Sequence, residues 1–409
     1  MNEPKLRFKA DDGNQFPSWD EKKLGDICTP LTYGMNVAAI KYDGLNKYIR
    51  ITDIDDESHL YKSDEYVSPN GVLDDRYLVG ENDILFARTG ASVGKSYIYN
   101  KKDGKLYYAG FLIKAHVKSE NSNFVFYQTL TERYAKWVQL TSMRSGQPGI
   151  NANEYSEFGI QIPCLQEQQK IASLFTELDN LIQSAEKELE GYRELKQCML
   201  QKMFPKKGET VPEIRFPEFS GYWKKHKLRD LAKIVGGGTP STSNTDFWDG
   251  EINWFAPAEI ASQVYVSSSK RKITKLGYNS SSARMLPIGT VLFTSRAGIG
   301  KTAILSEEAC TNQGFQSIVP DGSKLDSYFI FARSAELKRY GETVGAGSTF
   351  VEVSGKQMAA MPLMIPPTLD EQKKIGEYFQ NLDNLIASQQ QELEGYKALK
   401  KGLLQQMFC

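Results

Sequence analysis

Two glycine-rich loops carry cationic and hydroxyl side chains in a pattern that suggests contact with phosphate. One has the sequence GASVGKS at 90–96, and the other has the sequence GIGKT at 298–302. A Walker loop needs four residues between its glycines so that successive N–H groups wrap the phosphate. These loops have three and one, and each leads into a second apolar run. The pattern therefore predicts a hairpin turn or a loop that meets a DNA backbone, and it argues against a nucleotide site.

Three further loops are rich in glycine and hydroxyl side chains. The sequence GGGTPST at 236–242 precedes several aromatic residues, and the segments 143–147 and 345–349 occupy matching places before the two longest helical patterns. Such loops could contact phosphates and bases, or they could be connectors, the first of them packed by buried tryptophans. The candidate DNA-contacting residues are Arg88, Thr89, Ser92, Lys95, Arg144, Thr239, Ser241, Thr242, Arg296, Lys301, Ser348 and Thr349.

The sequence contains no motif that indicates catalysis. The three histidines (His59, His116, His226) lie far apart, with no HExxH or GxSxG pattern. The five cysteines are scattered and form no CxxC pair, which argues against a structural zinc site or a disulfide framework. No glycine-rich motif for a methyl donor is present. We therefore expect a binding protein, not an enzyme, with no catalytic residue, cofactor or metal of its own.

The composition indicates an ordinary multi-domain globular protein. The 409 residues are 40% hydrophobic and 24% charged, and Lys+Arg equals Asp+Glu at 50 each, so the net charge indicates no polyanionic partner. The length predicts two or more domains. No apolar run reaches the roughly 18 residues of a membrane span, and the polar start does not resemble a signal peptide. These features predict a soluble protein of the cytoplasm, with no membrane partner.

An internal repeat organises the chain. Aligned without gaps, residues 167–204 and 371–408 are identical at 22 of 38 positions, an offset of 204. Upstream, the same offset relates weaker matches, such as Trp19 with Trp223. The chain therefore reads as a tandem duplication in which two head segments have diverged and two long segments have not.

The long segments have the periodicity of helices. Their apolar residues follow mostly alternating spacings of four and three, which is the a/d pattern of a coiled coil. Thr368-x-x-Glu371 predicts a capping box at the second start. Each stripe must be covered, either by the other helix, as we expect, or by the helix's own head. The predicted packing residues are Ile171, Phe175, Leu178, Ile182, Leu189, Tyr192, Ile375, Phe379, Leu382, Ile386, Leu393 and Tyr396.

The sequences of the heads predict an α+β fold that is rich in sheet. Short β-type runs alternate with turns of glycine, serine and asparagine, and one helix per head is expected, around 122–138 and 325–340. The predicted strands are Tyr48–Ile51, Asp83–Phe86, Ser96–Tyr99, Ile252–Phe255 and Thr290–Phe293. We expect an antiparallel pair of helices with pseudo-two-fold symmetry. The predicted divisions are head 1 at 1–163, helix 1 at 164–204, head 2 at 205–367 and helix 2 at 368–409.

The layout resembles the specificity subunits of type I restriction-modification systems over essentially the whole chain. The resemblance rests on the helix starts IPCLQEQQKI and IPPTLDEQKKI, on the LDNLI and QxMF repeats, on the head starts W…KLGDI and W…KLRDL, and on GGGTPS…FWDGEINW. Cys164, where the second copy has Pro367, is a minor departure.

The resemblance implies that each head is a target-recognition domain for one half of an asymmetric bipartite sequence in double-stranded DNA. It implies that the helices form an antiparallel coiled coil, set the spacer and dock two copies of the modification (methyltransferase) subunit. A restriction (motor and nuclease) subunit would join through the complex, and methyl transfer and cleavage would belong to those partners. The alternatives are a scaffold that joins two identical partner proteins without DNA, and a fused methyltransferase or nuclease.

Overall fold

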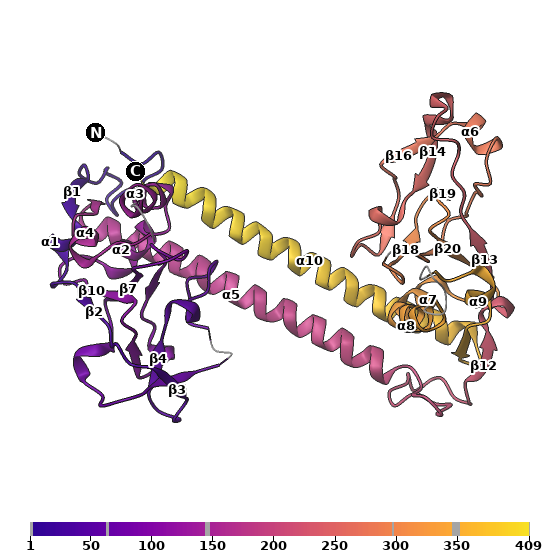
Figure 1. Cartoon of the computed structure of the whole chain (residues 1–409), viewed down its shortest axis with the longest axis horizontal. Coiled ribbons are helices and arrows are strands. Elements are labelled where there is room, and N and C mark those ends of the chain that lie inside the picture. The colour runs from indigo at the N-terminus through magenta and orange to yellow at the C-terminus, as the bar shows by residue number, and fades with distance from the viewer. Residues whose placement is uncertain (1–2, 63–64, 144–147, 297, 346–351, 409) are drawn as a thin grey trace. The chain divides into compact units, whose positions relative to one another are not determined.

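The computed structural model divides the chain into two compact units that share the long helices. It describes residues 3–62, 65–143, 148–296, 298–345 and 352–408. Unit 1 comprises Met1–Glu186 and Glu392–Cys409, and unit 2 comprises Lys187–Gln391. Each unit therefore holds one head, the first part of the helix that follows it and the last part of the other long helix (Figure 1).

Unit 1 is built on a four-stranded sheet in the order β2-β10-β7-β8, beside a three-stranded sheet in the order β4-β9-β6. Two further strand pairs, β1-β11 and β3-β5, complete it. The described strands are β1 (Asp20–Lys23), β2 (Thr32–Tyr33), β3 (Ala39–Lys41), β4 (Lys47–Ile49), β5 (Val67–Pro69), β6 (Leu78–Val79), β7 (Asp83–Ala87), β8 (Ser96–Ile98), β9 (Leu106–Tyr108), β10 (Leu112–His116) and β11 (Gly159–Ile162).

Unit 2 repeats this plan with a five-stranded sheet, β13-β20-β17-β18-β15, beside a three-stranded sheet, β16-β14-β19, and a pair, β12-β21. The described strands are β12 (Lys224–Lys227), β13 (Ala232–Gly236), β14 (Trp248–Phe255), β15 (Tyr265–Val266), β16 (Arg271–Ile273), β17 (Val291–Phe293), β18 (Thr302–Leu305), β19 (Cys310–Thr311), β20 (Gln316–Pro320) and β21 (Pro362–Ile365). The predicted α+β class is confirmed, and each of the five predicted strands overlaps an observed one.

The prediction of one helix in the middle of each head is wrong, because each predicted segment is broken in two. In head 1, Thr131 caps a new helix by accepting from the Tyr134 N–H, three residues after the preceding helix ends. In head 2 the break lies at Arg333. The described head helices are α1 (Leu24–Ile27), α2 (Ser122–Gln128), α3 (Glu132–Ser142), α4 (Ala152–Ser156), α6 (Lys275–Asn279), α7 (Ser327–Ala332), α8 (Ser334–Gly345) and α9 (Gly355–Ala359). Short 3-10 turns occur at Ile51–Asp53, Asp75–Tyr77, Lys101–Asp103, Leu228–Asp230, Thr245–Phe247 and Pro257–Glu259.

The two long helices are present as predicted, and they pack together in antiparallel fashion in both units. They are α5 (Leu165–Lys202) and α10 (Leu369–Met407). In unit 1 Lys400 Nζ lies 2.5 Å from Asp179 Oδ1, and in unit 2 Lys196 pairs with Asp383. In both pairs the two residue numbers add up to 579, as they must when two antiparallel helices keep one pairing register along their length. Within the described residues, none of the helices combines the length and the apolar character required to cross a membrane.

The long helices are covered by the heads as well as by each other, so both sequence alternatives hold in part. In unit 1 the start of α5 joins the head core together with the last residues of α10, among them Phe408. The Phe408 ring lies 5.5 Å from Phe124 and 5.7 Å from Phe175. In unit 2 Phe204 lies 5.5 Å from Phe329 and 6.0 Å from Phe379. The repeated Met-Phe endings thus close the core of each unit.

A buried carboxylate in the first turn of each long helix fixes the head to that helix. Glu167 accepts from Arg7 Nε at 3.0 Å and Nη2 at 2.8 Å, and from Trp19 Nε1 at 3.2 Å. Glu371 accepts from Arg215 Nε and Nη2, both at 2.8 Å, and from Trp223 Nε1 at 3.3 Å. The hydrogen bond to Glu167 raises the pKa of Arg7. We call each set the Arg–Glu–Trp anchor.

The anchor changes the expected helix cap. The Thr368 hydroxyl accepts from the Glu371 N–H at 3.3 Å, but the Glu371 carboxylate is committed to Arg215 and Trp223. Only half of the predicted capping box therefore forms.

The glutamine that follows each anchor carboxylate makes a second repeated contact. Gln168 Oε1 accepts from the Asn121 N–H at 2.9 Å, where helix α2 begins. Gln372 Oε1 accepts from the Asp326 N–H at 3.1 Å, where helix α7 begins. Because Asn121 and Asp326 are the N-caps of these helices, the Glu-Gln pair sets the position of each head helix relative to the long helix.

The aspartate of each LDNLI repeat joins three elements. The Tyr127 hydroxyl donates to Asp179 Oδ2 at 2.8 Å while Lys400 approaches the other oxygen. The Tyr328 hydroxyl donates to Asp383 Oδ2 at 2.7 Å while Lys196 pairs with that carboxylate. Burial raises the pKa of both Tyr127 and Tyr328, so each phenol stays protonated and acts as a donor.

We predict that Glu167→Ala lowers the free energy of unfolding by about 2–3 kcal/mol, because the partly buried Arg7 guanidinium and the buried Trp19 N–H lose the acceptor that they share. Chemical denaturation followed by tryptophan fluorescence measures the change, since Trp19 contacts the carboxylate. The double variant Arg7→Leu/Glu167→Leu should lower the free energy of unfolding less than Glu167→Ala does. Glu190→Ala is the control, because its carboxylate is largely exposed and lies 3.8 Å from Arg193; it should shift stability by no more than about 0.5 kcal/mol. Equal losses for Glu167 and Glu190 would contradict the assignment.

Candidate functional site

The two glycine-rich loops are hairpin connections. The first joins β7 to β8 and the second joins β17 to β18, both antiparallel pairs. A phosphate loop instead leads from a strand into a helix whose first N–H groups face the ligand. The hairpin prediction is therefore confirmed, and the loops lack the helix that a Walker site uses.

The hydrogen bonds show which loop positions correspond. The Ala87 N–H donates to Lys95 O at 2.8 Å and the Gly94 N–H to Ala87 O at 3.0 Å. Thr294, Lys301 and Gly300 form the same pair of bonds, both at 3.0 Å. Ala87 is thus equivalent to Thr294. It follows that Arg88 corresponds to Ser295 and that Arg296 corresponds to Thr89, so the arginines of the two loops occupy neighbouring, not equivalent, positions.

Glycine is required next to the lysine that both loops contain. Gly94 has φ +88° and Gly300 has φ +92°, a region that side chains rarely adopt. A Cβ at Gly94 would lie 2.6 Å from Val138, and one at Gly300 would lie 2.4 Å from Lys338. The third helix-forming segment of each head (α3 or α8) therefore packs directly against its loop.

In head 1 the loop side chains differ in how freely they could meet a ligand. The Arg88 guanidinium lies 4.9 Å above the Tyr33 ring, and Thr89 bridges to Gly149. Ser92 is half-buried. Lys95 is only 10% exposed, donates to Ile54 O at 3.1 Å and pairs with Asp56 at 2.5 Å. The Lys95 ammonium group is therefore already bonded within head 1, and its DNA contact stays a prediction from the sequence.

In head 2 the loop cations lie at the surface. Arg296 is about half-exposed and pairs with Glu352 at 2.9 Å, and Lys301 is exposed. Two tryptophans fix the backbone of the GGGTPST segment. Trp254 Nε1 donates to Gly238 O at 2.8 Å, and Trp248 Nε1 donates to Ser241 O at 3.1 Å. Ser241 and Thr242 are exposed, and Thr239 bonds to Gln313. Arg144, Ser348 and Thr349 lie outside the described residues.

The predicted packing residues form two groups along the helices. The first group is buried in the head cores: Ile171, Phe175, Leu178, Ile375, Phe379 and Leu382. Farther along the helices, Ile182, Leu189 and Leu393 are buried. Tyr192, Ile386 and Tyr396 are half-buried.

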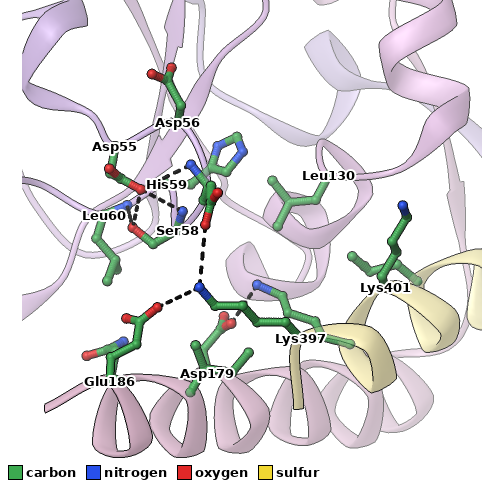
Figure 2. A pocket seen from close by; sticks show the side chains of 15 residues that line it. Asp55, Asp56, Ser58, His59, Leu60, Leu130, Asp179, Glu186, Lys397 and Lys401 are labelled. Atoms are coloured by element: carbon green, nitrogen blue, oxygen red, sulfur yellow. Dashed lines mark hydrogen bonds and ion pairs between the residues drawn. The ribbon is translucent and has the colours of Figure 1, made fainter. Parts of the chain in front are cut away.

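A pocket of about 970 Å³ lies in unit 1 between the loop at 55–60 and the two long helices (Figure 2). Several of its charged residues pair with one another: Lys397 lies 2.8 Å from Glu186 and 3.4 Å from Glu57. His59 Nδ1 lies 2.8 Å from Ser96 O, and burial lowers its pKa. In the part of the chain that the structure describes, no group of three or more His, Cys, Asp or Glu side chains could hold a metal ion. At the pocket, the ion pairs of Lys397 link the head loop to both long helices.

The repeated contacts were not found from the sequence, apart from the Glu-Gln motif that contains the carboxylate. Arg7 and Arg215 are 208 residues apart, whereas the carboxylates they bind are 204 apart, so an ungapped comparison does not pair them. Tyr127 and Tyr328 are 201 apart and are hidden in the same way.

Comparison with known proteins agrees with this arrangement. The model of the type I restriction modification DNA specificity domain matches residues 18–191 and again 221–395. The MjaIX type I restriction enzyme specificity subunit of Methanocaldococcus jannaschii is 32% identical over 189 residues, which are 46% of this chain and 44% of that protein. A second protein of that organism, the putative type I restriction enzyme MjaX specificity subunit, is 24% identical over 97% of this chain and 94% of its own length.

Solved structures share the fold. The crystal structure of a type I restriction-modification system S subunit from M. genitalium aligns over 100% of this chain and 99% of that one, with a TM-score of 0.66 at 12% identity. A chain from a structure of a type I restriction-modification system aligns over 96% and 98%, with a TM-score of 0.54 at 18% identity. Because the family model matches both halves, which together make up most of the chain, this protein belongs to the type I restriction-modification DNA specificity family and carries the domain twice.

Proposed function

We propose that this chain is the DNA-recognition subunit of a type I restriction-modification complex in which each head reads one half of an asymmetric bipartite site. The chain itself is non-catalytic, needs no cofactor and acts in the cytoplasm. Two copies of a modification (methyltransferase) subunit dock on it, and a restriction subunit joins through that complex. The helices set the spacer between the half-sites.

One observation carries this proposal: the two halves repeat their internal contacts and differ in their outward loops. The Arg–Glu–Trp anchor recurs with the same residue types in both units, and the Tyr–Asp–Lys contact recurs on the same carboxylate oxygens. At the hairpin loops, Arg88 of one head corresponds to a buried serine of the other. Two heads that share their internal contacts but carry different surface loops are suited to reading two different half-sites.

The long helices support the choice of partners. Their sequences are identical at 22 of 38 aligned positions, so each half presents a closely similar helical surface. Equal surfaces bind equal partners, which is the reason for proposing two copies of one subunit.

The proposed DNA contacts are loop residues of the two heads, of which Arg296 and Thr239 also have partners within head 2, Glu352 and Gln313. In head 1 these are Arg88, Thr89 and Ser92, and in head 2 they are Arg296, Lys301, Thr239, Ser241 and Thr242. Arg144, Ser348 and Thr349 remain sequence-based candidates. An arginine can form a bidentate contact with guanine or phosphate, while a lysine contributes mainly a point charge.

We predict that Arg88→Ala and Arg296→Ala each weaken binding of the full chain to duplex DNA. If the lost contact is to phosphate, the slope of log K against log salt should fall by about one for each residue. If it is to a base, preference at one position of one half-site should be relaxed. Titrations at several salt concentrations, with Arg193→Ala on helix α5 as the matched arginine control, measure both. A wild-type chain without salt-dependent binding to duplex DNA would instead support the protein scaffold.

We predict that lengthening both long helices together widens the spacer of the recognised sequence. Seven residues inserted after Glu186 and seven after Gln391 keep the contacts within each unit and preserve the heptad period. They add about 10.5 Å of helix, at 1.5 Å per residue, or about three base pairs at 3.4 Å each. Sequencing of methylated sites in cells that carry the variant gives the gap directly.

The matched control is the same insertion in α5 alone, which shifts the register between the helices and should abolish modification. An active double insertion with an unchanged gap would show that the helices are not the spacer. Half-sites that changed along with the gap would show that the insertion had disturbed the heads.

A further inference from the structure

Three residues are neighbours in the backbone register where the four-stranded sheet of head 1 ends. Tyr33 pairs with Ile113 across β2 and β10, and Ala87 pairs with Leu112 across β7 and β10. The Arg88 N–H donates to Phe111 O at 3.0 Å, which extends the β7–β10 ladder by one row. Because side chains alternate between the faces of a sheet, Tyr33, Arg88 and Phe111 share one face.

Two of these three residues are exposed, and Arg88 is half-buried. Phe111 is 61% exposed and Tyr33 is 41% exposed. The Tyr33 hydroxyl accepts from the Ala152 N–H at 3.1 Å, which holds the ring in place beneath the Arg88 guanidinium. Within the described residues no carboxylate forms an ion pair with Arg88, whereas Arg296 of head 2 pairs with Glu352. A fixed, uncompensated guanidinium beside an exposed aromatic ring suits an anionic ligand that also has an apolar contact point.

Head 2 has the same backbone at this place without the side chains. The Ser295 N–H donates to Gly314 O at 2.7 Å, as the Arg88 N–H does to Phe111 O. Gly236 pairs with Gln316, which occupies the place of Ile113, so Gly236 stands where Tyr33 stands in head 1. Glycine, serine and glycine therefore replace tyrosine, arginine and phenylalanine. The cluster therefore belongs to head 1 and is not part of the backbone arrangement that the two heads share.

We propose that Tyr33, Arg88 and Phe111 form a base-reading cluster that gives head 1 a guanine–thymine determinant in the major groove of its half-site. Arg88, oriented by Tyr33, donates to the guanine edge, and Phe111 packs on the thymine methyl group of a neighbouring base pair. Adjacent strands lie about 4.8 Å apart, between one and two base-pair rises of about 3.4 Å, so the two side chains fall on neighbouring pairs. The inference rests on the proposed DNA-binding function.

The test uses duplexes that carry the site recognised by the full chain, with each thymine of the head 1 half-site replaced in turn by uracil, which lacks only the methyl group. Wild-type affinity should fall several-fold at one position. Phe111→Ala should bind the thymine and uracil duplexes equally, at the wild-type uracil level. Arg88→Ala should lose about 10- to 100-fold preference for guanine at the adjacent pair. Preferences in the head 2 half-site should not change.

Two further variants separate a base contact from a general surface effect. Leu45→Ala removes an apolar side chain of nearly equal exposure (63%) from the same head and should leave the thymine preference intact. Phe111→Leu keeps an apolar group and should restore part of the preference. If Phe111→Ala retains the full thymine-to-uracil difference on DNA that the wild type binds specifically, the cluster does not read thymine and the DNA-binding function still stands. If the wild type shows no sequence preference, both proposals fall together.

Discussion

The structure depends on a carboxylate that is removed from water at the start of each long helix. Such a group is stable only when its charge and its lone pairs are satisfied, since desolvation of a carboxylate costs several kcal/mol. Glu167 receives two bonds from Arg7 and one from Trp19, both of which belong to the beginning of the head, while Glu167 follows its end. The anchor thus ties the entry and exit of the head to one helical turn. The sequence between these points can vary where it contributes neither to the head core nor to the contacts of Asn121 and Tyr127 with the helix.

On the long helices, several of the repeated residues serve more than one partner. Asp179 contacts Tyr127 of the head and Lys400 of the other helix. Phe408 packs against Trp19 and Phe175 at once. A substitution on a helix would disturb a head and a helix together, and the same contacts exist in the second unit. This accounts for two helices that have kept 22 of 38 residues while the heads between them have diverged.

Sequence reasoning succeeded where a signal is periodic and local. The a/d spacing predicted both long helices, and short apolar runs predicted the strands, because these patterns are set by the geometry of one element. It failed where structure depends on distant partners. Arg7 is 160 residues from Glu167, and nothing in its local sequence marks it. The single helix expected around 122–138 is broken after Gln128, because the Thr131 hydroxyl caps a new turn more favourably than the helix would continue.

The candidate site shows the same difference between features that local sequence predicts and features that depend on distant partners. Residue types identified both loops, but Lys95 and Arg88 look alike in sequence. Only the fold reveals that Lys95 is paired with Asp56, whereas the half-buried Arg88 is stacked on Tyr33. The hydrogen-bond register then shows that Arg88 and Ser295 occupy one backbone position. Under the proposed function, recognition changes by substitution at fixed positions of a shared frame, without altering the anchors. Stability and specificity then lie in separate residues, and this separation permits a duplicated chain to hold two different readers.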